Sequence, residues 1–422
     1  MGLIRFALNC GPGEGRIKNL GLSHIGNAER NKRIILNTLR DQAPLPRIEL
    51  SRICKLSIAT TKRLVDELIS EGLVLEGEPD ARSGRGRKAA LLHLNGQHGY
   101  AIGIGIEPES LEVQAISFSG RSLHRQKLDA HADSAVMLEE RIAAAVRQMQ
   151  DFCAAADCGP LMGVGAGIAG LVNARDGIVL YCPGIPGWEN VDLASFLRNA
   201  TGADAIVDDA VRCMALAEKR YGAGRDLDTF LFVYIGSGVG SGILLDNRIY
   251  RGTHGVSGEF GHITIRENGP LCKCGNHGCL EALVSTDAIL LRVKEAVSAG
   301  VYSSLHETPG VPLTLALVYA AARGGDKLAN MVIAETEENI GIGIANLINV
   351  FDPGTVILAG DVILTYHQLI LEGTQRIVGR RAMHSIAHRT LIQRSAFDLD
   401  TAALGAATMV IERVLQNEIL NL

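Results

Sequence analysis

The residues of this sequence that are best suited to chemistry are histidines and cysteines that lie close together in the chain. Cys272, Cys274 and Cys279 follow His262, and His277 lies among the cysteines. One imidazole and three thiolates are the four ligands of a closed, tetrahedral structural zinc site. Nine cysteines are an odd number for a set of disulfides, and clustered cysteines favour a metal over buried free thiols. The spacing therefore predicts a structural Zn2+ site, with either His262 or His277 as the nitrogen ligand.

Two adjacent carboxylates form a second candidate site. Asp208 and Asp209 follow the apolar segment Ala205–Val207 and precede a helical pattern from Val211 to Arg220. Side chains at strand-to-helix junctions commonly face a ligand site. The pair could bind sugar hydroxyls, act as a general base, or only cap the following helix.

A glycine run, Gly236–Gly242, is a third candidate. It lies between the apolar segments 232–235 and 243–245. Its backbone N–H groups could hold a phosphate. Alternatively, the run is a hairpin whose glycines allow close backbone contacts.

The N-terminal part of the chain has the pattern of a winged helix-turn-helix domain, which we expect over residues 27–95. Helical patterns begin at Asn27, Pro46 and Ile58, and Ser57 is a suitable N-cap for the third helix. Two strand-like segments, 73–75 and 90–94, flank a basic loop. The glycine-rich residues 1–26 lack a sustained period, and we expect them to form a flexible arm.

The charge of this domain favours a nucleic-acid partner. Residues 1–95 hold 16 Lys and Arg against 10 Asp and Glu, so their excess of +6 leaves −11 on the other residues of a chain with net charge −5. Polar and basic side chains off the apolar stripe of the third helix suit base edges and phosphates of double-stranded DNA, and wing arginines suit phosphates. The alternative is a helical domain with a solvated basic surface. The apolar stripe is expected at Ile58, Leu64, Val65, Leu68 and Ile69, and the DNA contacts at Ser57, Ala59, Thr60, Thr61, Lys62, Arg63, Arg85 and Arg87.

Residues 96–422 have the pattern of a mixed α/β body. Glycine-rich strand patterns at 100–106, 111–118 and 161–171 precede a second series at 229–245 and 355–358, with helices expected at 135–152 and 327–350. The repeated strand pair indicates two similar lobes. A composition of 47% hydrophobic and 21% charged residues excludes disordered and coiled-coil classes. No apolar stretch approaches the roughly 18 residues of a membrane span, so we expect a cytoplasmic protein without membrane contact.

Several of these segments together resemble the ROK family, which groups sugar kinases with sugar-responsive transcriptional repressors. The most specific match is Gly258-Glu-Phe-Gly-His262 with Cys272-x-Cys274-Gly-Asn-x-Gly-Cys279-Leu-Glu281, and further similar blocks are Gly163–Ile168, Pro183–Trp188, Asp209-Ala210 with Ala215–Glu218, and Asn349–Pro353. The resemblance implies His262 as the nitrogen ligand of zinc. It also implies an actin-like, ribonuclease-H-like body of two lobes with a sugar cleft between them. Lobe one is expected at about 96–207 plus the C-terminal helix, and lobe two at about 208–400.

The resemblance also assigns roles to the carboxylates and shows where this chain departs from the family. Asp209 corresponds to the general base of the kinases and would here be vestigial, while the expected sugar ligands are Asp208, Asp209, Glu259, His262 and Glu281. The family usually has asparagine at the positions of Asp208 and Val211. The kinases hold ATP phosphates with Asp-x-Gly-Gly-Thr, where this chain has Gly105-Ile-Glu-Pro-Glu109, and their paired glycines near the C-terminus read Gly360-Asp361. Proline lacks an N–H donor and carboxylates repel phosphate, so phosphotransfer and catalytic residues are expected to be absent.

These observations predict a regulator rather than an enzyme. We expect a DNA-binding repressor of carbohydrate-metabolism genes, controlled by a small carbohydrate effector and acting as a homodimer or homotetramer. The alternative is a sugar kinase for hexoses or N-acetylhexosamines with a regulatory head. A third hypothesis is a body that binds no small molecule and receives a protein signal.

Overall fold

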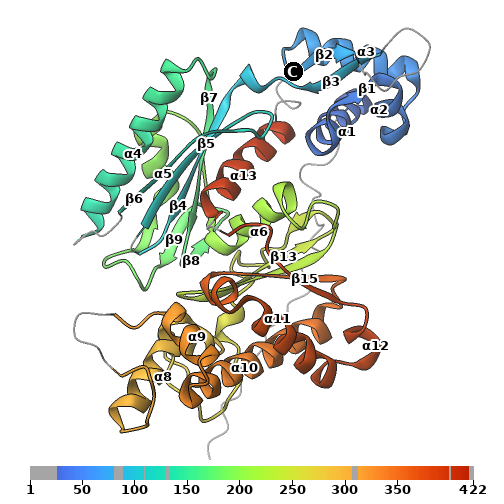
Figure 1. Cartoon of the computed structure of the whole chain (residues 1–422). Helices are drawn as coiled ribbons and strands as arrows, with labels where there is room; N and C mark the ends of the chain where they lie inside the picture. The colour runs from blue at the N-terminus through green and yellow to red at the C-terminus, as the bar shows by residue number, and fades with distance from the viewer. Residues whose placement is uncertain are drawn as a thin grey trace, which may run out of the picture.

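The computed structural model of the chain describes residues 26–79, 89–108, 110–129, 134–306, 312–398 and 401–417 (Figure 1). Residues 1–25 of the expected arm lie outside these described residues, as do the wing arginines Arg82, Arg85 and Arg87 and the carboxylate Glu109. Among the helices within these ranges, none has the length and apolarity that crossing a membrane requires.

The head of the molecule has the predicted pattern of three helices and a small sheet. The side chain of Ser57 accepts a hydrogen bond from the backbone N–H of Thr60 and caps the third helix. Leu36, Leu64 and Leu68 are fully buried and pack the helices together. Its elements are α1 (Asn27–Gln42), β1 (Leu45–Pro46), α2 (Arg47–Cys54), α3 (Ile58–Ser70), β2 (Val74–Pro79) and β3 (Ala90–Leu94), with strand order β1-β3-β2. These elements confirm the winged helix-turn-helix.

The first part of the body is a five-stranded sheet with strand order β11-β7-β4-β5-β6. β4 and β5 form an antiparallel hairpin, and β7 and β11 continue the sheet in parallel. The strand β6 was not expected, because most of its residues are polar and none is buried, unlike those of its neighbours β4 and β5. The elements here are η1 (Gly96–His98), β4 (Tyr100–Ile106), β5 (Ser110–Ser117), β6 (Ser122–Asp129), α4 (Ala135–Ala155), β7 (Leu161–Ile168), β8 (Leu171–Asn173), β9 (Ile178–Tyr181), β10 (Glu189–Asp192), α5 (Leu193–Thr201) and β11 (Ala205–Asp209).

A second sheet repeats this topology. Its order is β14-β13-β12-β15-β16, again with an antiparallel hairpin of β12 and β13 and a parallel continuation through β15 and β16. The repeat confirms that the two strand pairs seen in the sequence open two similar lobes. The elements here are β12 (Phe230–Ile235), β13 (Val239–Leu245), β14 (Arg248–Ile249), η2 (Phe260–His262), α7 (Glu281–Val284), α8 (Thr286–Ser298), α9 (Leu315–Arg323), α10 (Lys327–Phe351), β15 (Thr355–Ala359), α11 (Asp361–Arg381), α12 (His384–Ala387) and β16 (Leu391–Arg394).

Two helices, α6 (Ala210–Tyr221) and α13 (Ala402–Asn417), lie in the middle of the molecule between the two sheets (Figure 1). Their backbones touch: a Cβ added at Gly405 would lie 1.8 Å from the carbonyl oxygen of Cys213. Glycine at this position is therefore a condition for the packing of α13 against α6.

The head shares a hydrophobic core with the body. Leu36 and Leu39 of α1 belong to one buried cluster with Phe118 beside the first sheet and with Val410 and Ile411 of α13. This cluster crosses the domain boundary that we predicted after residue 95. The orientation of the head is therefore set by packing against α13 and not by a loose linker.

Candidate functional site

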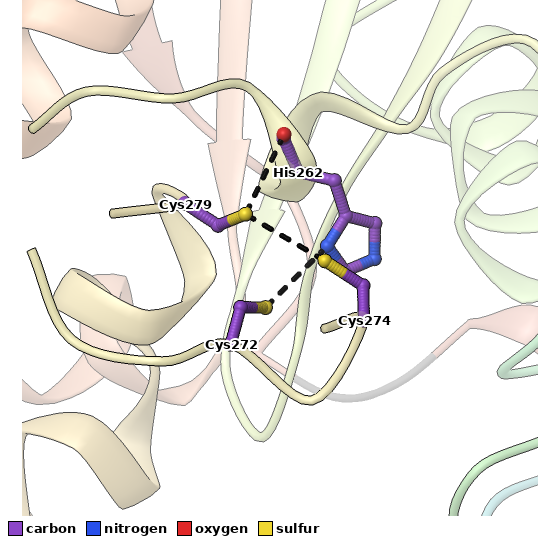
Figure 2. A group of neighbouring side chains, drawn as sticks. All are labelled: His262, Cys272, Cys274 and Cys279. Atoms are coloured by element: carbon purple, nitrogen blue, oxygen red, sulfur yellow. Dashed lines mark hydrogen bonds between the residues drawn. The ribbon is translucent and has the colours of Figure 1, made fainter. Parts of the chain in front are cut away.

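His262 and the three cysteines converge on one point (Figure 2). Their ligand atoms all lie within 4.8 Å of one another. The Sγ atoms of Cys274 and Cys279 are 3.7 Å apart, as are the Sγ of Cys272 and the Nδ1 of His262. A tetrahedral site with zinc–sulfur bonds of about 2.3 Å requires ligand separations of about 3.8 Å. The donor set and these separations fit a four-coordinate metal ion.

The second candidate histidine is directed elsewhere. The Nδ1 of His277 lies 3.3 Å from the carbonyl oxygen of Gly269, outside the cluster. The loop that carries the cysteines is shaped by Gly278, where φ is +68° and an added Cβ would lie 1.5 Å from the carbonyl oxygen of Arg266. The geometry therefore brings His262, and not His277, to the thiols.

Asp209 lies at the junction of β11 and α6, as the sequence indicated. One of its carboxylate oxygens accepts a hydrogen bond of 3.0 Å from the backbone N–H of Arg212 and caps α6. Burial raises the pKa of Asp209 to about 7; the guanidinium of Arg212 opposes this shift, and the carboxylates of Asp208 and Glu259 add to it. Asp209 is both a helix cap and a carboxyl group that titrates near neutral pH.

Asp208 has a different environment. It is only 1% exposed, and its two oxygens accept hydrogen bonds of 2.7 Å from the Nε atoms of Arg212 and Arg251. Arg212 also donates to the carbonyl oxygen of Ser257, just before the segment that carries Glu259. Asp208 therefore positions two arginines, and its expected contact with a ligand stays a prediction.

Glu259, Glu281 and His262 lie near Asp209, and we call these four residues the acid group. The Nε2 of His262 is 3.9 Å from an Oε atom of Glu259, and the pKa of Glu259 is raised by burial and by the charge of Glu281. Glu281 accepts a hydrogen bond of 3.0 Å from the backbone N–H of Val239. The Nδ1 of His262 thus faces the thiols while its Nε2 faces a carboxylate, so any metal on the thiols would orient this ring.

The glycine run forms the tight turn of the β12–β13 hairpin. Gly240 and Gly242 lie against α6, where added Cβ atoms would come within 2.9 Å of Val211 and 2.4 Å of Ala215. Close packing on α6 accounts for these two glycines. The hairpin interpretation therefore describes this part of the run.

Two further carboxylates, Glu107 and Asp361, lie in the segments that the sequence resemblance aligned with the ATP-binding segments of the kinases. Glu107 follows β4, and Asp361 begins α11. Burial raises the pKa of Asp361, a hydrogen bond of 2.7 Å from Thr286 lowers it, and the charge of Glu107 adds to the rise. The two lobes therefore present like charges to each other at this point.

The third helix of the head exposes most of the residues expected to contact DNA. Ala59, Lys62 and Arg63 are exposed, and Arg63 forms an ion pair with Glu67 one turn later. Thr61 is only 1% exposed because it faces the helical core, so its expected contact with DNA is corrected. Ile58 was expected in the apolar stripe but is 65% exposed, since it stands in the first turn at the outer end of the helix.

Comparison with known protein families decides the classification. The family model "ROK family" matches residues 101–413, and the model "Winged helix-turn-helix DNA-binding" matches residues 29–74. This chain belongs to the ROK family. The Xylose repressor of Caldicellulosiruptor bescii is 30% identical over an alignment of 391 residues, and the match covers 91% of this chain and 96% of that protein.

Solved structures of ROK proteins resemble the chain over different lengths. A ROK family transcriptional regulator, described as a homologue of the Escherichia coli MLC protein, superposes with a TM-score of 0.80 at 28% identity and covers 93% of this chain and 98% of its own. The ROK hexokinase of Thermus thermophilus superposes with a TM-score of 0.62 at 25% identity and covers 75% of this chain and 99% of its own. The regulator matches nearly the whole chain, whereas the hexokinase matches about three quarters of it.

Sequence reasoning on this ROK protein missed the arginines that organise the acid group. Arg212 follows Asp208 by four residues at the start of α6. An acid and an arginine at this spacing are close enough to form an ion pair, so the sequence could have predicted their contact. Arg251 is distant in sequence from Asp208, so its contact left no local signal.

Proposed function

We propose that this chain is a DNA-binding transcriptional repressor of carbohydrate-metabolism genes whose operator affinity is controlled by a small sugar. The observation that carries the proposal is the combination, in one chain, of a winged helix whose third helix exposes Lys62 and Arg63 and a body that keeps the acid group. The likeness to a named repressor and to a ROK transcriptional regulator over more than nine tenths of this chain supports it. A repressor needs recognition of a sugar but no chemistry on it.

The acid group supplies the recognition. Carboxylates and an imidazole form charge-assisted hydrogen bonds to hydroxyl groups in fixed directions. The capping bond uses one oxygen of Asp209, and no hydrogen bond of the other oxygen is found among the described residues. We assign sugar contacts to Asp209, Glu259, His262 and Glu281. The expected site is the cleft between the two lobes.

A structural Zn2+ ion, one per chain, would be held by His262, Cys272, Cys274 and Cys279. It would supply a rigid, closed ligand loop and no open coordination position. Glu281 follows Cys279 closely and His262 is itself a ligand, so the loop positions two members of the acid group. The same metal would therefore stabilise the fold and orient the sugar contacts.

DNA contacts are proposed for Ala59, Thr60, Lys62 and Arg63 of α3, with the cap Ser57 at the helix start and Arg85 and Arg87 on the wing. A homodimer or homotetramer would place two such helices on a palindromic operator. Fluorescence anisotropy on the DNA upstream of the gene tests this proposal, with Lys62→Ala expected to reduce the salt slope of binding by about 1. Lys294→Ala, an exposed lysine on α8, is the control.

The sugar effect is measured in the same assay with D-xylose, D-glucose or N-acetylglucosamine added. A change in operator affinity with one of them supports the proposal. Operator binding that lacks salt dependence and sequence preference contradicts the repressor function, and sugar independence with intact operator binding contradicts the effector site.

A second candidate function is a sugar kinase with a regulatory head. The raised pKa of Asp209, about 7, favours it, because a general base works best near the ambient pH. Glu107 and Asp361 oppose it, since both would repel the phosphates of ATP. A coupled assay with ATP over hexoses and N-acetylhexosamines decides: turnover of roughly 1–100 per second is typical of kinases, and we expect none.

A further inference from the structure

Helix α6 connects the acid group to the DNA-binding head. Its N-cap is Asp209, and its C-terminal turn carries Arg220. A helix of this length spans about 18 Å. The two ends of one rigid element thus lie at the proposed sugar site and at the head.

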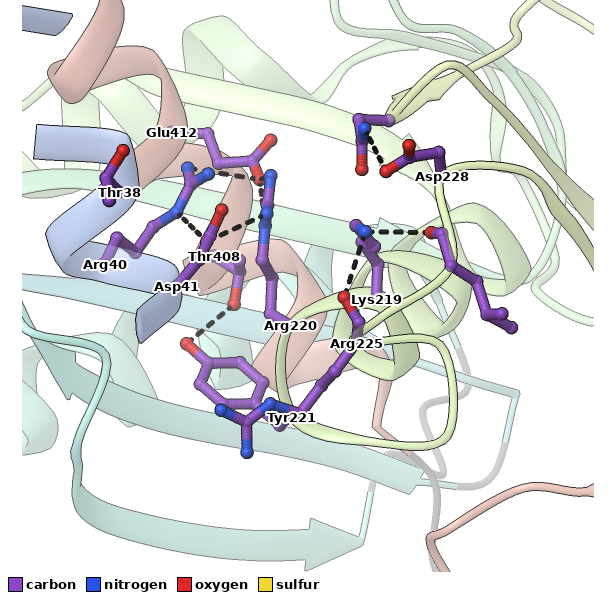
Figure 3. Close-up of polar contacts among 12 residues, drawn as sticks. Thr38, Arg40, Asp41, Lys219, Arg220, Tyr221, Arg225, Asp228, Thr408 and Glu412 are labelled. Carbon is purple, nitrogen blue, oxygen red and sulfur yellow. Dashed lines mark hydrogen bonds and ion pairs between the residues drawn. The ribbon is translucent and has the colours of Figure 1, made fainter. Parts of the chain in front are cut away.

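Arg220 joins three helices (Figure 3). Its guanidinium lies 3.2 Å from the Oδ1 of Asp41, at the end of α1, and forms an ion pair with Glu412 of α13. Arg40 of α1 contacts the same Glu412 at 3.6 Å. We call Arg40, Asp41, Arg220 and Glu412 the Arg220 clamp. Arg220 is 11% and Glu412 20% exposed, so solvent screens this pair less than an ordinary surface pair, whereas Asp41 is 44% exposed.

Helix α6 is buried over most of its length, and its C-terminal turn borders a cavity. On one side it touches α13 through Gly405, and α13 packs into the core of the head through Val410 and Ile411. On another side β13 packs against it through Gly240 and Gly242. The last turn of α6, with Arg220, lines a cavity of about 1760 Å³ together with Glu412 of α13 and Asp41 of α1. A helix packed in this way moves as a rigid unit with its neighbours, and the cavity leaves room for the contacts of its C-terminal turn with the head to change.

We infer that Arg220 is a positioning residue that makes the orientation of the DNA-binding head depend on the contacts that Asp209 makes at the N-terminal end of α6. The inference rests on the proposed function for the nature of the ligand. A sugar hydroxyl bound to Asp209 acts on the N-terminal end of α6, and a shift of α6 moves Arg220 relative to Asp41 and Glu412. The clamp supplies the difference in interaction energy between two head orientations that any ligand-driven change requires.

The first experiment compares the sugar response of operator binding in the full chain and in Arg220→Met. Coupling between two sites typically changes an affinity by about 5- to 150-fold. In Arg220→Met, we expect this factor to fall below about twofold, the additivity limit for independent sites, while direct calorimetric affinity for the sugar stays within about twofold of the wild type. A purely structural role would change operator affinity equally with and without sugar, so an unchanged factor overturns the inference.

Two variants keep this result interpretable. Arg220→Lys keeps the charge but loses the planar fork that bridges two acids, so we expect it to restore part of the sugar response. Arg225→Met removes an exposed arginine from the lining of the same cavity, for which no ion pair is found among the described residues, and should leave the response unchanged. A response lost equally in Arg225→Met would contradict a specific role of the clamp.

The second experiment needs neither sugar nor DNA. Amide hydrogen exchange of α1 is measured in the full chain, in Asp209→Ala, in Arg220→Met and in the double variant. If α6 transmits the state of its N-cap, Asp209→Ala speeds exchange in α1 only while Arg220 is present, and the two changes are not additive. Additive effects, or no effect of Asp209→Ala on α1, overturn the inference even if sugar and operator bind as proposed. A wild type that ignores sugars in the first experiment contradicts the proposed function instead.

Discussion

The acid group and the pair Glu107 and Asp361 carry the same kind of charge but have opposite consequences for a ligand. In the acid group, Asp209 is balanced by the buried guanidinium of Arg212 and by a backbone N–H. Glu107 and Asp361 act on each other across the two lobes, where a kinase would place phosphates. Carboxylates accept hydrogen bonds from hydroxyls and repel phosphates, so we propose a sugar contact for the first region and predict weak ATP binding at the second. The contrast matches what the proposed repressor requires, which is recognition of a sugar without phosphoryl transfer.

The largest expected effect is a loss of stability when the proposed metal cluster beside the acid group is disrupted. Cys274→Ser removes one of the proposed metal ligands, and we expect loss of zinc and a drop in the free energy of unfolding of more than about 4 kcal/mol, because structural metal contributes folding energy directly. Elemental analysis and thermal unfolding measure this. Cys158→Ser, a half-buried cysteine outside the cluster, should keep its metal. Full zinc content and an unchanged midpoint in Cys274→Ser would falsify the metal assignment.

The next effect concerns the sugar contact itself. Asp209→Ala should weaken sugar binding by about 10- to 100-fold, the value of one charge-assisted hydrogen bond. Isothermal titration calorimetry measures it with the sugar that the operator assay identifies. Asp192→Ala is a matched control, since Asp192 caps α5 with a hydrogen bond of 2.9 Å to the backbone N–H of Ser195. Equal losses in both variants would show that helix capping, and not sugar contact, is the role of Asp209.

The raised pKa of Asp209 predicts a pH dependence of stability. Between its ordinary value of 3.8 and about 7, the folded chain holds a proton on Asp209 that the unfolded chain has released. The free energy of unfolding therefore falls as pH rises through this window, by at most about 1.4 kcal/mol per pH unit, and is level above it. The difference in denaturant unfolding between wild type and Asp209→Asn isolates this slope. If the difference in unfolding free energy between wild type and Asp209→Asn does not vary with pH, the pKa of Asp209 is not raised by folding. The electrostatic difference between the two regions is then wrong.

The smallest effect is expected in the region of Glu107 and Asp361. Replacing both Glu107 and Asp361 with glycine removes two negative charges and should raise the affinity for a fluorescent ATP analogue by roughly three- to tenfold. The double variant Glu139→Gly with Glu140→Gly on α4 removes two acids elsewhere and serves as the control. No gain in nucleotide affinity would mean that charge alone does not disfavour ATP.

Much of the head and of the metal site could be predicted because the signals are local. The cap Ser57, the strand-to-helix junction at Asp208 and Asp209, and the clustered cysteines each depend on a few adjacent residues. The polar strand β6 and the short strand β16 could not be predicted, since their pairing with neighbours, rather than their own pattern, defines them. Thr61 was misplaced because the helical period leaves side chains at the edge of the apolar stripe undecided.

The order of amino acids alone establishes which chemical groups are present: three clustered thiols and a histidine, a pair of acids, and a helix that carries Lys62 and Arg63. Only the tertiary structure decided how they act, because burial and long-range contacts set their environment. Asp208 became a partner of two arginines while Asp209 remained with one oxygen to offer, and Arg220 met Asp41 and Glu412 from distant helices. Asp208 and Asp209 are neighbours in sequence but have different partners, because contacts with distant parts of the chain determine which groups lie next to each carboxylate.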